Sequence, residues 1–423
     1  MNDPKRNSVL PYYGWFVLAA SALCEMLAQG ATSYGAGLFV LPLQAEYGLS
    51  RANASSAILI LFVGAVFVAP IAGRILDRFP IRISVIVGAL CFSLALTVIA
   101  MSSSLWIMAL MVLVPVALAF GLLGPMNTST LASRWFFRRR GLALGIAAIA
   151  TSGGGILVVP FLSKAIELYG WRHALLAEAA VFFGIIVALA LMVLRDNPFK
   201  AGYGEHLENK GRNDQAALLA AGQARVPDEA STWRKVLGNT GFWAPSLMLA
   251  AISSIAQVIV VSMPAYGHQL GFGAASSAFL ISIFSLAAAL TKILAGVMAD
   301  YWDKRLLLFA TAIFMPLALG MLWIFSGYVA LVVACALAGV ALGGVLPLSN
   351  GLIAARFGVT RFGAVIGWTY MLLSFSILVA VRFAGTVFDR TGSYRGAFEG
   401  LLLAALLISV CAFLIDRRRE TAR

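Results

Sequence analysis

Gly73-Arg-Ile-Leu-Asp-Arg-Phe-Pro-Ile-Arg82 is a short charged stretch that lies between two long apolar runs. A second version of it, Gly296-Val-Met-Ala-Asp-Tyr-Trp-Asp-Lys-Arg305, lies in the other half of the chain. The first glycine, the aspartate and the last arginine of the two stretches are each 223 positions apart. Because matching in register over such a distance is hard to obtain by chance, it indicates an internal duplication. The chain is therefore predicted to consist of two related halves.

The composition is that of an integral membrane protein. Of the 423 residues, 61% are hydrophobic and only 12% are charged, and the mean hydropathy is +0.92. Soluble domains carry roughly 25% charged residues, and a soluble fold of this size could not bury so much apolar surface. We therefore predict an all-α membrane protein surrounded by the lipid bilayer.

The net charge of +13 does not indicate a nucleic-acid-binding protein. The basic residues gather in short segments between apolar runs, which is the distribution expected of cytoplasmic loops. These segments contain Arg74, Arg78 and Arg82; Arg134 and Arg138 to Arg140; Lys304 and Arg305; Arg356 and Arg361; and Arg417 to Arg419. Nucleic acid is accordingly not expected as a partner.

Twelve apolar segments are long enough to cross the hydrocarbon layer, which takes about 20 helical residues. They cover about residues 12–41, 53–73, 82–101, 105–132, 141–166, 173–195, 241–266, 275–299, 305–325, 328–354, 363–387 and 396–415. This pattern predicts two pseudo-symmetric six-helix bundles, residues 1–195 and 240–423, joined by a cytoplasmic linker at 196–239. An even number of crossings places both termini on the arginine-rich, cytoplasmic side. We expect a monomer in the inner membrane of a bacterium.

The sequence contains no motif for catalysis, a metal or a cofactor. The three histidines are scattered, and the four cysteines lie far apart without metal-ligand spacing. The run Gly153-Gly154-Gly155 is not a phosphate loop, because no Gly-Lys-Ser/Thr follows it. An enzyme and an ATP-driven pump are both unsupported, and neither a cofactor nor a metal ion is expected.

The opening stretch resembles the loop between the second and third helices of major facilitator transporters, written G-x-L-x-D-R-x-G-R-R. The matching residues are Gly73, Leu76, Asp77, Arg78 and Arg82, and Pro80 stands where a glycine is common. The resemblance implies two parallel six-helix repeats that rock around a central site. An aspartate near a neighbouring helix N-terminus gains dipole and arginine partners, which predicts a gate at the inner side; the alternative is a plain cytoplasmic anchor loop. The predicted gating residues are Gly73, Asp77, Arg78, Arg82, Gly296, Asp300 and Arg305.

A second set of motifs is similar to the monocarboxylate and oxalate/formate branch of that superfamily. It consists of Tyr13-Gly14-Trp15, Ser33-Tyr34-Gly35-x-Gly37-x-Phe39, Arg134-Trp-Phe-Phe-Arg-Arg-Arg-Gly-Leu-Ala-Leu-Gly-Ile146 and Tyr169-Gly170-Trp171-Arg172. The branch typically carries an arginine in the eighth helix, where this chain has Lys292. Lysine keeps the charge but loses the planar, two-pronged grip on a carboxylate. Animal members also place an aspartate one turn earlier, where Ala288 stands, so coupling is open between proton symport and anion exchange.

Lys292 is the leading candidate for contact with a substrate. A lone charge at mid-bilayer costs at least about 2.5 kcal/mol, so such residues are functional candidates. Ser285 falls on the same helical face, which predicts a polar stripe facing a wet cavity. The alternative is a lysine that snorkels to the cytoplasmic surface. The predicted substrate-binding residues are Lys292, Gln29, Ser33, Tyr34, Asn127, Ser285 and Tyr370.

Two carboxylates lie inside apolar runs. Glu25, on a polar face of the first helix, is a candidate for carrying a coupling proton. A structural pair with Lys292 or a hydrogen bond at a helix end is an equal alternative for it. Glu178 is expected to form a structural pair with Arg172 or Lys164.

The remaining polar residues of the spans are given structural roles. Arg382 is expected to snorkel toward the outer headgroups. Hydroxyl residues such as Thr151 and Ser152, which precede the triple glycine, are candidates for lining the cavity, but helix packing is favoured for each, since such residues join membrane helices without a ligand.

The sequence therefore predicts a secondary transporter of a small organic anion, a monocarboxylate, that works by alternating access. The coupled species is either a proton or a counter-anion. An alternative on the same fold is an exporter of an apolar or cationic compound in which Glu25 is the coupling or binding acid. A non-transporting receptor is a third reading, and an added soluble domain would mark it.

Overall fold

The computed structural model describes residues 13–48, 56–136, 139–196, 198, 233–359 and 361–421. Within these ranges the chain is almost entirely helical and contains no strand. Most of the predicted linker at 196–239 lies outside the described residues, so its role stays a prediction. The short helix α12 (Trp233–Leu237) belongs to the end of that segment.

The first crossing is not α-helical throughout. α1 (Gly14–Gln29) continues into a π-helical turn at Gly30–Tyr34, a 3-10 segment at Gly35–Phe39 and α2 (Val40–Tyr47). The sequence predicts one continuous span over 12–41, and apolar periodicity carries no sign of this change in winding. The irregular part begins at Gly30 and contains two further glycines, which favour a regular helix less than other residues except proline.

The other crossings of the first half follow the predicted order. They are α4 (Ser56–Arg78); α5 (Ile81–Met101); α6 (Leu105–Met111) with a π-helical turn at Val112–Val116, α7 (Ala117–Leu123) and α8 (Pro125–Trp135); α9 (Arg140–Leu157); and α10 (Val159–Met192). The π-helical turn contains Pro115. Proline has no backbone N–H to donate, and this disturbs the regular hydrogen-bond ladder.

The number of crossings follows from the length of one segment. Eleven segments of the described chain are long and apolar enough to span a membrane, and one of them, Arg140–Met192, has 53 residues. A helix of that length would measure about 80 Å, against a hydrocarbon core of about 30 Å. The backbone turns at Gly170, where φ is 77° and ψ is 159°, a conformation that favours glycine. This segment therefore crosses twice, and the prediction of twelve crossings is confirmed.

The second half has longer uninterrupted helices. They are α13 (Thr240–Gln269), α14 (Ala274–Tyr301), α15 (Lys304–Ala312) with α16 (Phe314–Ile324), α17 (Tyr328–Phe357), α18 (Phe362–Thr391) and α19 (Arg395–Thr421). These six crossings match the predicted spans within a few residues.

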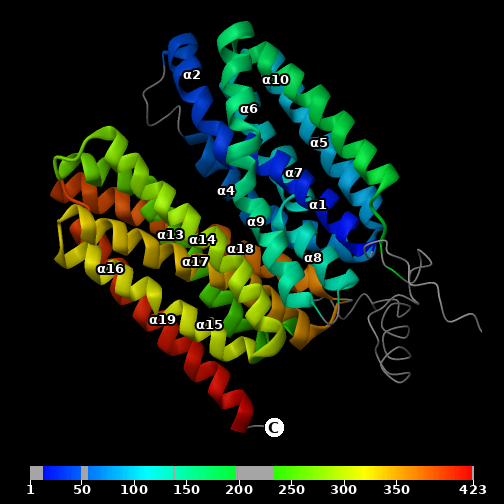
Figure 1. Ribbon diagram of the computed structural model, residues 1–423. Coiled ribbons are helices and arrows are strands. Elements are labelled where there is room, and N and C mark those ends of the chain that lie inside the picture. Colours follow the sequence, from blue (N-terminus) through cyan, green and yellow to red (C-terminus); the bar gives the residue numbers. More distant parts are fainter. Residues whose placement is uncertain are drawn as a thin grey trace, which may run out of the picture.

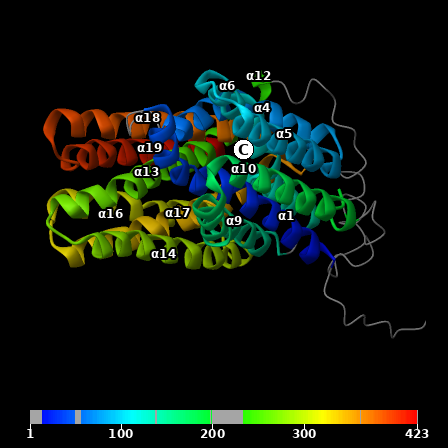
Figure 2. The same ribbon diagram turned by 90° about the horizontal axis from the view of Figure 1, so that it is seen from above.

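Each half packs around its own apolar core. One cluster of buried side chains, which includes Phe92 and Trp135, comes from the first half. The other includes Phe242 and Phe398 and comes mainly from the second half, with a few side chains of α4 such as Leu76. Figures 1 and 2 show the two halves as separate helix bundles that lie side by side.

The two bundles meet along two helix pairs, α4 with α18 and α9 with α14. Glycines bring the backbones together in both pairs. A Cβ atom added to Gly73 would lie 2.2 Å from the carbonyl oxygen of Gly363, and one added to Gly145 would lie 2.5 Å from that of Lys292. No side chain fits at these two positions unless the helices separate.

These contacts lie toward one end of the molecule. In Figure 1 the bundles converge near α8 and the start of α18 and diverge toward α2 and α16. The convergent end carries Asp77 and Asp300, and we refer to it as the closed end.

Alanine at Gly73 or Gly145 is expected to destabilise the packing between the bundles. Overpacking costs about 1–3 kcal/mol, which outweighs the roughly 1 kcal/mol by which alanine favours a helix over glycine. We expect a lower thermal-unfolding midpoint for Gly73→Ala and Gly145→Ala. Gly385→Ala in α18 is the matched control, because its Cβ would meet no atom within 4 Å. A midpoint that falls equally in all three variants would contradict the prediction.

Candidate functional site

Lys292 lies at the interface between the two bundles. It belongs to α14, and its side chain is only 3% exposed. Its Nζ donates hydrogen bonds to Thr151 Oγ1 at 2.7 Å and to Ser152 Oγ at 2.8 Å, both on α9 of the other half. The amine therefore does not reach an aqueous surface, and the alternative of a snorkelling lysine does not hold.

The local sequence explains this arrangement. Gly145 on α9 and Gly296 on α14 allow the two backbones to touch, which brings Lys292 against the helix that carries Thr151. The Thr151 hydroxyl donates to the Ala148 carbonyl at 2.7 Å. Its oxygen can therefore accept from the lysine while its hydrogen is engaged elsewhere.

Tyr34 extends this set of contacts to the first helix. It ends the π-helical turn Gly30–Tyr34, and its hydroxyl donates to the Thr151 carbonyl at 3.1 Å. A Cβ atom on Gly155 would lie 3.1 Å from the Tyr34 ring, so the missing side chain leaves room for it. Tyr34 is 44% exposed. The tyrosine thus lies beside the helix segment whose hydroxyl groups hold Lys292, and nearly half of its own side chain is exposed.

Glu25 is buried beside these residues. It is 0% exposed, and neither carboxylate oxygen has a hydrogen-bond partner within the described part of the chain. It lies within electrostatic range of Lys292, Tyr34 and Tyr370. The Thr128 hydroxyl group lies beside the Glu25 carboxylate. In the described structure Glu25 forms neither an ion pair with Lys292 nor a hydrogen bond to a helix end.

The other predicted binding residues occupy different positions. Ser33 donates to Gln29 Oε1 at 2.9 Å, so these two side chains are engaged with each other. Tyr370 is buried, and its hydroxyl has no hydrogen-bond partner among the described residues. The same holds for both amide atoms of Asn127. Ser285 is exposed.

Two residues of the site, Thr151 and Ser152, are absent from the set predicted to bind substrate. As hydroxyl residues inside a span they looked like packing residues. Two features of the sequence could have indicated a role at the site. Both residues stand directly before three glycines, and the duplication places their helix opposite the second aspartate stretch.

The predicted pairing of Glu178 is wrong. Arg172 instead forms an ion pair with Glu46, with a distance of 2.7 Å between Nη2 and Oε1, and Lys164 is exposed. Neither oxygen of Glu178 has a hydrogen-bond partner in the described structure. Glu46 pairs with Arg172 because it lies near the C-terminal end of the first crossing, where Tyr47 and the Ser102 carbonyl also accept from Arg172.

At the closed end, Asp77 binds the N-terminus of a helix in the other half. Its Oδ1 accepts from the backbone N–H of Gly363 at 2.9 Å, and its Oδ2 accepts from that of Ala364 at 2.6 Å. Both N–H groups belong to the first turn of α18, where the helix dipole favours a negative charge. Arg134 Nη2 lies 3.4 Å from Asp77 Oδ1.

Asp300 repeats this contact in the opposite direction. Its Oδ1 accepts from the N–H of Gly141 at 2.6 Å, and its Oδ2 accepts from that of Leu142 at 3.0 Å, in the first turn of α9. Arg140 lies within electrostatic range of Asp300. We refer to the contacts of Asp77 and Asp300 as the aspartate caps.

The arginines of the two stretches are placed differently from the aspartates. Arg78 is exposed. Arg82 donates to the carbonyl oxygens of Ala190 and Leu191, at the end of α10 in its own bundle. The backbone N–H of Arg305 donates to Asp303 at 2.8 Å. Of the seven predicted gating residues, Gly73, Asp77, Gly296 and Asp300 approach the opposite bundle directly.

The sequence has relatives that cover nearly all of it. Residues 18–282 and 256–423 match the family model described as Major Facilitator Superfamily. Monocarboxylate transporter 13 of Bos taurus is 24% identical over 418 residues, which covers 95% of this chain and 89% of that protein. Monocarboxylate transporter 11 of Homo sapiens is 25% identical over 414 residues, covering 94% of this chain and 81% of that protein.

A solved structure has the same fold. It is that of the proton:xylose symporter XylE bound to 6-bromo-6-deoxy-D-glucose. It matches with a TM-score of 0.72 at 15% sequence identity, over 93% of this chain and 94% of that one.

Alanine in place of Asp77 or Asp300 is expected to loosen the closed end. Each variant leaves two backbone N–H groups without their acceptor, at a cost of about 1–3 kcal/mol. In a variant without native cysteines, Ser129→Cys places a buried thiol between the bundles, where Ser129 now accepts from Asn350 at 2.9 Å. We expect this thiol to react about tenfold faster with a membrane-permeable maleimide when either aspartate is removed.

The control for that experiment is Asp303→Ala, which removes a cap from α15 within one bundle. Its reaction rate should stay at the background level. Equal rates in all the variants would show that the aspartate caps do not hold the bundles together.

Proposed function

The chain belongs to the Major Facilitator Superfamily, and we propose that it is a secondary transporter that moves a small organic anion, a monocarboxylate, across the bilayer by alternating access. The superfamily consists of carriers and not of enzymes. One observation carries the proposal: a buried ammonium group, Lys292, lies between the two bundles and is held only by neutral hydroxyl groups in the described structure.

A buried cation of this kind favours an anionic ligand. Removing an ammonium group from water is costly unless a charge or several hydrogen bonds compensate for it. No carboxylate forms an ion pair with Lys292 among the described residues, and the hydroxyl groups of Thr151 and Ser152 supply dipoles only. A substrate carboxylate would supply the missing charge through charge-assisted hydrogen bonds, which are stronger than neutral ones.

The surroundings favour one carboxylate over two. Lys292 is a single positive charge, and the carboxylate of Glu25 lies within electrostatic range of it. With Glu25 protonated, a monocarboxylate balances the charge of Lys292, whereas a second negative group on the substrate would leave an excess negative charge, which an ionised Glu25 would increase further. Two relatives are named monocarboxylate transporters, which also favours a substrate with one carboxylate. The hydroxyl group of Tyr34 and the buried polar groups of Asn127 and Tyr370 are available to orient the rest of the molecule.

The aspartate caps support alternating access. They hold the bundles together at one end, while the bundles diverge toward the other (Figure 1). The loops at the closed end carry the arginine clusters, so this end is assigned to the cytoplasm. The structure then corresponds to an outward-facing state, and release to the cytoplasm requires both caps to break. In this arrangement both termini are cytoplasmic, and the proposed location is the inner membrane of a bacterium, with the monomer as the working unit.

Glu25 is proposed as the group that takes the coupling proton. A carboxylate that is fully buried without a hydrogen-bond donor is unfavourable as an anion and gains most from a proton. Proton symport then follows from binding the substrate at Lys292 and the proton at Glu25. Exchange of one carboxylate for another would need Lys292 alone.

The alternative function is export of a lipophilic cation, with Glu25 as the binding acid. The same observation on Glu25 supports it, since an unpartnered buried carboxylate also suits a cationic ligand. The two functions differ in which charge the substrate meets.

Substitution of Lys292 tests the anion site. We expect Lys292→Ala in proteoliposomes to reduce uptake of a radiolabelled panel (lactate, pyruvate and benzoate) by more than about tenfold, because the ligand loses a charge-assisted bond of roughly 1.5–3 kcal/mol. Lys292→Arg should retain part of the activity. Lys164→Ala, which removes an exposed lysine of α10, is the control. Uptake by Lys292→Ala at the wild-type rate would exclude the anchoring role.

Substitution of Glu25 separates coupling from binding. We expect Glu25→Gln to abolish uptake driven by a pH gradient while substrate exchange across equal pH continues. A second measurement uses tetraphenylphosphonium and benzoate as ligands in thermal-shift assays. Loss of stabilisation by tetraphenylphosphonium in Glu25→Gln, with no response to benzoate in the wild type, would favour the exporter. Gradient-driven uptake that survives in Glu25→Gln would exclude Glu25 as the coupling group.

A further inference from the structure

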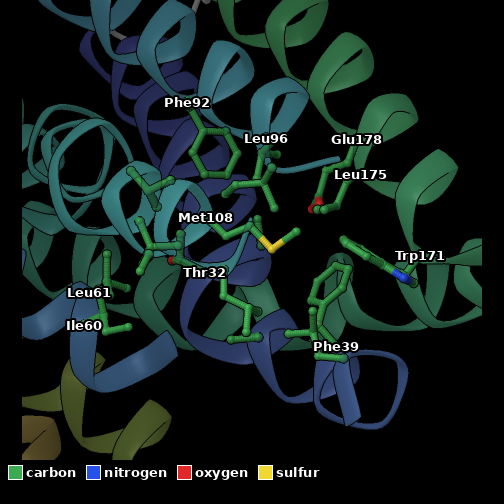
Figure 3. A pocket seen from close by; sticks show the side chains of 18 of the residues that line it. Thr32, Phe39, Ile60, Leu61, Phe92, Leu96, Met108, Trp171, Leu175 and Glu178 are labelled. Atoms are coloured by element: carbon green, nitrogen blue, oxygen red, sulfur yellow. The ribbon is translucent and has the colours of Figure 1, made fainter. Parts of the chain in front are cut away.

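A cavity lies within the first bundle, lined only by residues of that half. Its volume is about 450 Å³, within the range of about 300–1,000 Å³ typical of pockets for small ligands. The walls are almost entirely apolar, with Phe39, Phe92, Leu96 and Met108 among them (Figure 3). Neither Glu25 nor Lys292 lines it.

One charged group faces this cavity. Glu178 on α10 is 6% exposed, and neither carboxylate oxygen has a hydrogen-bond partner in the described part of the chain. Figure 3 shows its carboxylate reaching from α10 toward the space beside Leu96 and Met108. A buried carboxylate in this position is costly unless something donates to it.

The nearby donors are engaged elsewhere. Arg172 donates to the Ala100 carbonyl at 2.6 Å and pairs with Glu46 at 2.7 Å. The Trp171 ring nitrogen donates to Glu46 Oε2 at 2.7 Å and is turned away from the cavity in Figure 3. Thr32 lines the cavity, but its hydroxyl donates to the Ala28 carbonyl at 2.6 Å. No donor among the described side chains that line the cavity is left for Glu178, so its charge is balanced either by a proton on the carboxylate or by a ligand that donates to it.

We propose that this cavity is a binding site for a lipophilic amine. The ammonium group donates to Glu178 and balances its charge, and the apolar body fills the space between the aromatic and aliphatic walls. Glu178 is seven residues beyond Trp171, which is about 10 Å along a helix. The amine therefore lies at the inner part of the cavity, and the apolar end points toward Trp171 and Leu105, which also line it.

The charge selects among compounds of this shape. An alcohol of the same size donates one neutral hydrogen bond, whereas an ammonium donates charge-assisted bonds that are roughly twice as strong. A lipid chain fills the apolar part but gives Glu178 no donor. An amine is the class that satisfies both the shape and the carboxylate.

The test measures binding to the purified full-length chain in lipid nanodiscs, with 4-phenylbutylamine and the matched alcohol 4-phenylbutan-1-ol as probes. A ligand that binds only the folded state raises the unfolding midpoint. We expect the amine to stabilise the wild type. We also expect it to bind the wild type about 10- to 100-fold more tightly than it binds Glu178→Gln. The alcohol should bind both proteins alike.

Two further variants keep the result decisive. Glu167→Gln removes an exposed carboxylate that precedes the turn at Gly170 and should leave amine binding unchanged. Ala109→Phe narrows the cavity while Glu178 remains, so it should weaken both probes. The proposal is overturned if amine and alcohol bind the wild type equally, or if neither Glu178→Gln nor Ala109→Phe weakens the amine.

Discussion

The arrangement of the two bundles depends on a contact that occurs twice, in which a carboxylate binds the first turn of a helix in the opposite half. Asp77 binds the start of α18, and Asp300 binds the start of α9. Each half has its own apolar core, and the contact between halves combines these polar caps with glycines that bring the backbones together and with a few apolar side chains of the first half, such as Leu76 and Met126. The caps make the interface specific in register, because each carboxylate must meet the start of one particular helix. A large shared apolar core would have fixed one arrangement permanently.

The internal duplication repeats the aspartate caps in both halves, but it does not repeat the charge of Lys292. Gly145 approaches the carbonyl oxygen of Lys292, and in the other pair Gly367 approaches that of Ala69 in the same way. Ala69 and Lys292 are 223 positions apart, the same spacing as the two aspartates. The two interfaces therefore share this backbone contact, and at this position one has an alanine where the other has a lysine. Under the proposed function, this asymmetry gives the scaffold a single anion site, on the helix that also carries Asp300.

The sequence determined the architecture well and the site only in part. Apolar length, charge placement and the 223-residue repeat predicted the fold class and the twelve crossings, because these depend on composition and spacing. The π-helical and 3-10 segments of the first crossing could not be predicted, since hydropathy is insensitive to winding. The hydroxyl partners of Lys292 were considered as cavity residues but assigned to packing, because packing and binding use the same residue types. Arg172 pairs with Glu46, 126 positions away, which only the folded chain brings near.

Lys292 and Glu25 lie within electrostatic range of each other but do not form an ion pair in the described structure. A closed ion pair in the interior compensates its own desolvation, and a ligand would have to break it before binding. Because Lys292 and Glu25 stay apart, they retain most of the free-energy cost of their removal from water. A substrate carboxylate at Lys292 or a proton at Glu25 lowers that cost directly. Under the proposed function, this stored cost makes binding energy available to shift the bundles. The hydroxyl groups of Thr151 and Ser152 hold the lysine in place meanwhile. Both belong to α9, whose first turn Asp300 caps, so drawing the amine away from them would act on the helix pair that serves as a gate under the proposed function.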